Sequence, residues 1–486
     1  MEPDNSSARV TPSISPAASE SSQSSYGLKA GALSPSETLA QSVALIAPTG
    51  APVMTVPLVF ALAGEGCALA FLISSITILL VALNVNQFAR ISASPGSLYT
   101  YVADHMHRRF GVIAGWALLI AYVGTAAAVS AGVTNYVNVI LRDRFGWQVF
   151  PVLSIAVVMV SACYLAYRDV EISARLMLWL EVASVALISL VAITIVVKHG
   201  WHLDLQQFRL KGVTPEKLRL GLVLAIFSFV GFESATALGS EARDPLISIP
   251  RAVKWSAILA GLFFLLCAYS EVLGFRGEAE TLDKSLAPFH VLAQKAGLPP
   301  LVGTLTDFGA VLSFFSCFLA CITAGARVLF LMGRHGALHS ILGEAHEENQ
   351  TPHRAVLLSS IAAFLPAGIM SLRGMTLFDI YGLAGTLATF GFLTVYILVS
   401  VAAPRYLRSK GRLTPSAITI SILAVVAMGA ALLGSLYPVP AAPYAILPYL
   451  YVGLLLSGFV WSMLRTARSR AAEINADLNG LPNEAE

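Results

Sequence analysis

Long apolar runs separated by short polar segments recur along the chain from residue 39 to residue 466. A run needs about 20 mostly apolar residues to cross the hydrocarbon core of a bilayer as a helix. Twelve runs reach this length, and the longest are expected to tilt. The pattern therefore predicts an all-α membrane protein with twelve transmembrane helices, at residues 39–63, 66–89, 110–140, 149–167, 174–197, 218–240, 254–275, 301–331, 355–372, 378–402, 415–436 and 443–466.

Two of the polar segments carry helical patterns of their own. Residues 95–108 predict a short amphipathic helix that leads into the third span. Residues 276–300 contain three prolines and predict an external loop with a short helix.

The composition agrees with a bilayer as the solvent. The chain is 56% hydrophobic and only 12% charged. If these 486 residues formed a soluble domain, so few charges could not cover that much apolar surface. A net charge of +3 with scattered basic residues argues against nucleic acid as a partner. The five cysteines form no CxxC pair and no histidine lies in a long apolar run, so we expect no metal and no cofactor. Without an HExxH or a GxSxG motif, an enzyme is not expected either.

The basic residues give an expected orientation. Twenty of the 31 lie in segments on the same side as the N-terminus, which places both termini in the cytoplasm and the protein in the cell membrane. Residues 1–35 are rich in Ser, Pro and Ala and lack the apolar core of a signal peptide, so they predict a disordered cytoplasmic tail.

The first span contains an unusual cluster of helix breakers. Pro48 and Pro52 each lack an N–H, and Gly50 between them adds backbone freedom. A half-helix restarting at Pro52 would leave the N–H groups near Thr49, Gly50 and Ala51 facing an anion at its positive end. The alternative is a proline kink that binds no ligand.

The sixth span is predicted to break as well. Gly231 lies in it, and the ionisable Glu233 is costly inside a membrane unless it faces a cavity or a partner. Two interrupted spans at corresponding positions of two five-helix halves indicate an inverted-repeat transporter with a site near the midplane.

The sequence around the second break resembles a known family. FVGFESATALGSEARDPLISIPRAV, at residues 229–253, is similar to the sixth-span signature of the amino acid–polyamine–organocation (APC) superfamily of permeases. PGSLYTYV at 95–102 and ARVLFLMGRHGALH at 326–339 resemble two further segments of that family. The resemblance covers spans 1–10 and implies a LeuT-type 5+5 inverted repeat with two additional helices. The first-span stretch APTGAP departs from the family's glycine-rich pattern.

The resemblance also implies a substrate site. The α-carboxylate would lie against the N–H groups near Thr49, Gly50 and Ala51. Phe227 matches a gating aromatic, and Tyr122 of the third span matches a second one, although ordinary helix packing is an alternative for both. The amino group would meet the unwound backbone of the two breaks, at Ile46, Phe227, Ser228, Val230 and Gly231.

Coupling to an ion gradient requires a group that titrates or binds the ion. Glu233 and Glu181, the latter deep in the fifth span, are the candidates for proton coupling. For Glu181, a structural hydrogen bond to a neighbouring span is the alternative. Some proton-coupled relatives use a fifth-span lysine, but the matching position here is near Ser184. Sodium coupling has weaker support, from the hydroxyls of Ser313, Ser316 and Thr323.

We therefore expect a transporter of amino acids by alternating access, with proton-coupled symport preferred. An amino acid/amine or polyamine exchanger is the main alternative, and a membrane-embedded sensor a more distant one. No acid lies in the first-span break itself, which favours a neutral solute. The expected organisation is a tail at 1–35, repeats at 36–200 and 201–402, two helices in 403–466 and a cytoplasmic tail at 467–486.

Overall fold

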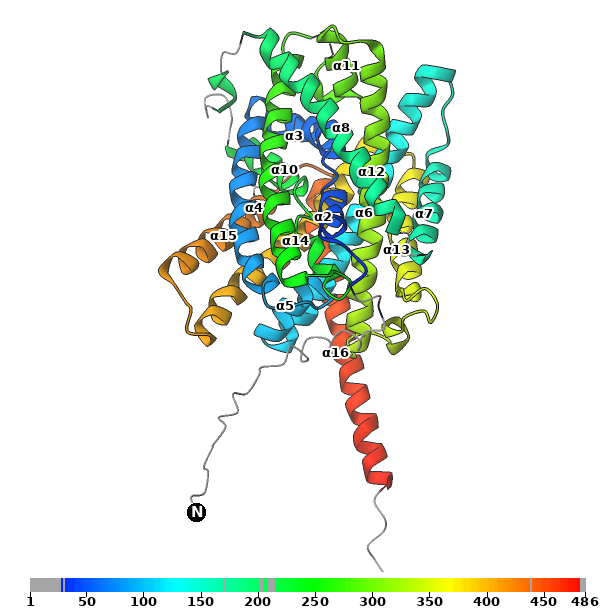
Figure 1. Cartoon of the computed structure of the whole chain (residues 1–486), viewed down its shortest axis with the longest axis vertical. Coiled ribbons are helices and arrows are strands. Elements are labelled where there is room, and N and C mark those ends of the chain that lie inside the picture. The colour runs from blue at the N-terminus through cyan, green and yellow to red at the C-terminus, as the bar shows by residue number, and fades with distance from the viewer. Residues whose placement is uncertain are drawn as a thin grey trace, which may run out of the picture.

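The computed structural model describes residues 28, 31–168, 171–200, 204–208, 215–278, 280–437 and 439–480. Within these residues every regular element is helical, and the only pairing of strand type is an isolated bridge between Leu33 and Ala242. Most of the long helices stand side by side as a bundle (Figure 1). Most of the expected N-terminal tail, at 1–35, lies outside the described residues.

The helices of the bundle are α2 (Pro35–Ile46), α3 (Val56–Ala63), α4 (Cys67–Ala89), α6 (Arg108–Phe145), α7 (Pro151–Arg168), α8 (Glu171–Lys198), α9 (Pro215–Phe227), α10 (Pro245–Phe275), α12 (Pro300–Arg334), α13 (His353–Leu372), α14 (Leu377–Ser409), α15 (Pro415–Gly434) and α16 (Leu447–Gly480). Short helices α5 (Ser97–His105) and α11 (Pro288–Lys295) lie where the sequence predicts them. Single turns occur at η4 (Gly64–Gly66), η5 (Leu205–Phe208), η7 (Leu282–Lys284), η8 (Ser340–Gly343) and η9 (Tyr444–Ile446).

Ten helical stretches among the described residues are long and apolar enough to cross a membrane, judged by length and composition. One of them is the 55-residue stretch Pro35–Ala89, which holds α2, α3 and α4. The opposite ends of the bundle are marked by α11 and by the end of α16 (Figure 1), and are called the α11 side and the α16 side below.

The centre of the bundle is formed by α6, α12 and α14. In the most apolar 18 residues of α6 and α12, 78% and 83% are buried, against 22% in α7 and in α15. Small residues let these central helices approach closely, because nothing projects between the backbones. A methyl group added at Gly391 of α14 would lie 2.4 Å from the carbonyl oxygen of Ala117 on α6.

The outer helices expose apolar side chains instead of polar ones. Val160 on α7 is 60% exposed and Leu433 on α15 is 66% exposed, and both helices carry further exposed leucine, isoleucine or valine residues. Such a surface is unfavourable in water and suits contact with lipid chains.

The first apolar run is interrupted where its prolines lie. Helix α2 ends at Ile46, and Ala47 takes a left-handed conformation with φ 48°. The chain resumes as a π-helical turn, η3 (Ala51–Thr55), before α3. Pro52 lies in the first turn of this segment, where a missing N–H costs no hydrogen bond.

A second interruption follows α9. Residues 228–233 form turns, and Gly231 has φ +102°, a conformation that side chains with a Cβ rarely adopt. The chain then continues as the short 3₁₀ helix η6 (Ser234–Leu238).

Candidate functional site

The two interruptions lie against each other in the centre of the bundle. The hydroxyl of Ser42 on α2 donates to the carbonyl of Phe232 at 3.0 Å and accepts from the N–H of Ala235 at 3.1 Å. A Cβ added at Gly231 would lie 2.2 Å from Leu45 Cδ2, so only glycine allows this approach. Segments about 190 residues apart in the sequence therefore form one buried unit.

Glu181 of α8 binds the first break. Its Oε1 accepts from the N–H of Thr49 at 2.9 Å, from the Thr49 hydroxyl at 2.8 Å and from the Ser313 hydroxyl at 2.8 Å. Ser313 of α12 in turn accepts from the N–H of Gly50 at 3.2 Å, and the N–H of Ala51 donates to the carbonyl of Ala47 at 2.9 Å. The three N–H groups that the sequence assigns to a substrate carboxylate thus all have partners within the protein.

This arrangement changes the electrostatics expected from the sequence. The break itself contains no acid, but α8 brings a carboxyl group into it across 132 residues of sequence. Glu181 is only 3% exposed, and no charged side chain contacts it in the part of the chain that the structure describes. The first break therefore faces one buried carboxyl group that can titrate.

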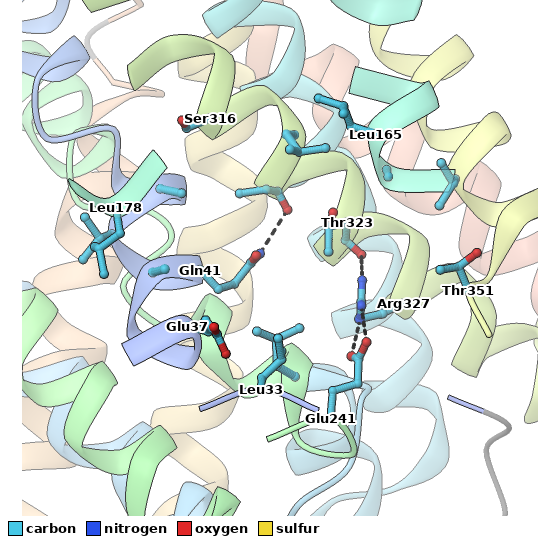
Figure 2. Close-up of a pocket in the computed structure, with 18 of the residues that line it drawn as sticks. Leu33, Glu37, Gln41, Leu165, Leu178, Glu241, Ser316, Thr323, Arg327 and Thr351 are labelled. Carbon is cyan, nitrogen blue, oxygen red and sulfur yellow. Dashed lines mark hydrogen bonds and ion pairs between the residues drawn. The ribbon is translucent and has the colours of Figure 1, made fainter. Parts of the chain in front are cut away.

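The lining of a cavity of about 130 Å³ includes Glu181 at the first break and Glu241 and Arg327 on the α16 side. Gln41 of α2, Ser316 of α12 and Leu178 of α8 line its walls (Figure 2). Toward the α16 side it reaches an ion pair in which Glu241 accepts from Arg327 at 2.8 Å and 2.5 Å. Both side chains of this pair are less than 10% exposed, so the pair lies below the surface of the molecule.

Glu233 lies at the second break and is fully buried. Tyr396 of α14 donates to its Oε2 at 2.8 Å, and the N–H of Gly231 donates to the same oxygen at 3.2 Å. Tyr122 of α6 donates to its Oε1 at a longer 3.5 Å. The hydroxyl of Ser228, in the same break, is buried without a partner among the described residues, so it is available to a ligand.

An aromatic layer, formed by Phe227, Tyr381, Phe314 and Tyr136, covers the breaks on the side of α3. Consecutive ring centroids in this order are 5.8, 5.8 and 6.2 Å apart. Tyr381 shares a hydrogen bond of 2.9 Å with Thr55, and Phe314 fills the space beside Gly50, where a Cβ would lie 2.5 Å from its ring. Because α3 lies toward the α11 side (Figure 1), the layer closes that side while the cavity opens the other.

The structure buries every residue that the sequence assigns to the site. Thr49, Gly50 and Ala51 gather around Glu181, whereas Tyr122 gathers with Glu233 at the other break. Phe227 belongs to the aromatic layer. The remaining assigned positions, Ile46, Ser228, Val230 and Gly231, lie at or beside the two interruptions.

Several residues of the site were missed at the sequence level. Tyr396, Phe314 and Tyr381 lie in apolar runs that contain many aromatics, and nothing in the sequence separates them from packing residues. Glu271 of α10 did have a signal, an acid near the end of an apolar run. It is fully buried, and neither carboxyl oxygen has a partner among the described residues.

Near the α11 side, His290 of α11 contacts Asp307 of α12 with an Nδ1 to Oδ2 distance of 2.6 Å. The hydrogen bond to Asp307 raises the pKa of His290, against the opposing effect of partial burial. This contact fixes α11 over the start of α12.

The described residues contain no cluster of three or more His, Cys, Asp or Glu side chains that could hold a metal ion.

Comparison with known proteins gives an independent view of the chain. Residues 38–473 match the family model described as amino acid permease. A branched-chain amino acid permease, BcaP of Bacillus subtilis, is 24% identical over 361 residues, which cover 70% of this chain and 73% of that protein. The low-affinity putrescine importer PlaP of Escherichia coli is 24% identical over 347 residues, covering 70% and 74%. Human cationic amino acid transporter 4 is 25% identical over 370 residues, covering 72% and 56%.

Proposed function

Because this chain belongs to the amino acid permease family, we propose that it moves amino acids across the cell membrane by alternating access. It is a multi-pass membrane protein, and the known proteins similar to it are named as amino acid and putrescine permeases. The observation that supports the proposal most is the buried contact between two interrupted helices, each with a carboxyl group beside it.

The proposed architecture has twelve spans. The stretch Pro35–Ala89 has 55 residues, which at about 1.5 Å per residue would extend far beyond the ~30 Å core of a bilayer, so we assign two crossings to it. Helix α9 with η6 supplies another crossing, interrupted like the first. We propose that spans 1–5, in 36–200, and spans 6–10, in 201–402, form the inverted repeat of the LeuT-type fold, followed by two helices in 403–466.

The proposed substrate site lies between the two interruptions. The amino group is directed to the unwound backbone near Ile46, Phe227 and Val230, where carbonyl groups favour a cation. The Ser228 hydroxyl is placed as an additional polar contact, because it is buried and has no partner among the described residues. The carboxylate is directed to the N–H groups at Thr49 and Gly50. Phe227, in the aromatic layer, and Tyr122, beside Glu233, complete the proposed site.

We propose that the transport is coupled to protons, with Glu181 and Glu233 as the titrating groups. An ionised carboxylate is costly inside the membrane, and protonation removes that cost. Glu181 lines the cavity on the α16 side, so a proton bound there can leave toward that side. With both termini assigned to the cytoplasm, the described conformation is inward-facing, closed on the outside by the aromatic layer.

Uptake by purified protein in liposomes tests this function. Labelled leucine, arginine and putrescine would be offered separately, with an inward proton gradient and without one. The proposal expects uptake of at least one amino acid, stimulated by the gradient. Uptake that ignores every ion gradient and requires internal amino acid would identify an exchanger instead, and no transport of any of the three would contradict the proposed function.

A further inference from the structure

Glu181 occupies the position that the bound substrate's carboxylate needs. In the described conformation, the N–H of Thr49 and the hydroxyls of Thr49 and Ser313 all donate to Glu181 Oε1. The next donor along the break, the N–H of Gly50, is engaged by Ser313. A substrate carboxylate placed here would find no free donor, and it would meet a second carboxylate in a space of low dielectric.

We infer that Glu181 competes with the substrate carboxylate for these donors, so that an amino acid binds there only when Glu181 has taken up a proton and released them. This inference rests on the proposed function, because it concerns the same site. In this step a hydronium ion gives one proton to a Glu181 oxygen and becomes water, so that one O–H bond breaks and one forms. The donors then turn to the substrate carboxylate, and no other covalent bond changes.

The exchange conserves the negative charge and the hydrogen bonds at the donors of the first break. With the site empty, ionised Glu181 supplies the one negative charge that the donors face. With an amino acid bound, Glu181 is neutral and the substrate carboxylate supplies that charge. In both states the backbone N–H groups of the break have an acceptor. A buried N–H group without an acceptor would cost free energy.

The cavity supplies the route for the proton. At about 130 Å³ it exceeds by far the ~10–15 Å³ that one water requires, and Glu181 forms part of its lining. The charged side chains that share this lining are Glu37 of α2, Glu241 and Arg327, and the last two form an ion pair. When the amino acid leaves toward the α16 side, Glu181 can therefore lose its proton to the same side and bind the break again.

The inference separates two classes of substrate. An amino acid requires the donors at the first break, so its binding should weaken as rising pH ionises Glu181. An amine without a carboxylate does not require them, and Glu181 can stay in place beside it. Pairs that differ only in the carboxylate, such as ornithine and putrescine or leucine and 3-methylbutylamine, isolate this effect.

The test measures the binding of both pairs to the purified full-length chain from pH 5 to pH 8. In the wild type, we expect the dissociation constant of the amino acid to rise with pH, up to tenfold per unit for one competing ionisation, while that of the amine does not rise. Glu181→Ala should remove the pH dependence and tighten amino acid binding at pH 8. Glu181→Gln should also remove it, and its similar size keeps the test valid if the alanine variant does not fold. The exposed Glu348→Gln serves as the control and should behave as wild type.

Two negative outcomes are distinguishable. Amino acid binding with the same pH dependence in wild type and in the Glu181 variants would overturn the competition and leave the proposed function standing. A wild-type chain that binds no member of either pair would contradict the proposed function, and the competition with it.

Discussion

Glu181 and Glu233 are both buried acids beside a helix break, but their donors come from different places. Glu181 accepts hydrogen bonds from the broken segment and from α12, so a change in its charge acts on the first break directly. Glu233 accepts from the N–H of Gly231 in its own break, and also from tyrosines of α14 and α6, which are central helices of the bundle. A change in the charge of Glu233 therefore acts on the contact between the second break and these two helices.

Removing the shorter of these tyrosine contacts tests the role of Glu233. Tyr396→Phe deletes the 2.8 Å hydrogen bond, and the loss of a bond to a charged group costs about 1.5–3 kcal/mol. We expect uptake to fall by about tenfold or more at neutral pH, since 1.4 kcal/mol corresponds to a factor of ten. Tyr451→Phe is the matched control, because Tyr451 loses a hydroxyl bonded only to Thr394 in the described structure. Equal uptake by the two variants would contradict a role for Glu233 in transport.

Glu271 gives a prediction about stability. Its carboxyl group is buried without a hydrogen-bond partner among the described residues, and such an unmet group costs about 1–3 kcal/mol. We expect Glu271→Met, with an apolar side chain of similar length, to raise the melting temperature of the detergent-purified protein. The partly exposed Glu65→Met, which loses an ion pair with Arg276, should not raise it. A melting temperature below that of wild type would show that Glu271 has a stabilising partner.

At the scale of elements, the second break depends on a backbone conformation that glycine provides. Gly231 combines φ +102° with a close approach to Leu45, so a methyl group is excluded both by conformation and by space. We expect Gly231→Ala to abolish uptake and to lower the melting temperature. Gly429→Ala on α15 is the control, since nothing lies within 4 Å of its added Cβ. Normal uptake by Gly231→Ala would mean that the second break does not require this geometry.

The contact between α11 and α12 should depend on pH. The pKa of His290 is raised by its hydrogen bond to Asp307, so protonated His290 stabilises the folded state. That stabilisation is complete when the pH is below the pKa of histidine in the unfolded chain, about 6.5. It is lost as the pH rises through the higher pKa of His290 in the folded protein. Hydrogen exchange of residues 288–295 should therefore accelerate above neutral pH in the wild type. In His290→Gln the exchange should not change with pH beyond its intrinsic dependence, and an identical profile in both proteins would contradict the assignment.

At the scale of the whole molecule, the sequence predicts those features of the fold that depend only on neighbouring residues. Apolar run length gives the long helices, and the Pro48, Gly50 and Pro52 cluster gives the first interruption, because proline and glycine act on their own backbone. The site could be predicted only in part. That Glu181 reaches Thr49, or that Phe314 lies against Gly50, follows from the packing of α8 and α12 on the break, and no local pattern encodes it.

The closed and open sides of the molecule belong to this largest scale as well. The aromatic layer and the cavity lie on opposite sides of the paired breaks, as one state of an alternating-access cycle requires. Glu181 lies between them, in contact with the break and with the cavity. Coupled movement of an amino acid and a proton through this position is the central claim of the account.

The most direct test measures both species at once. Wild-type protein in liposomes with a pH-sensitive dye in the lumen would be given a labelled amino acid at an external pH below the internal one. The account predicts that uptake acidifies the lumen beyond the leak seen without amino acid, and that Glu181→Gln removes the additional acidification. Amino acid uptake by the wild type with no additional acidification would contradict it.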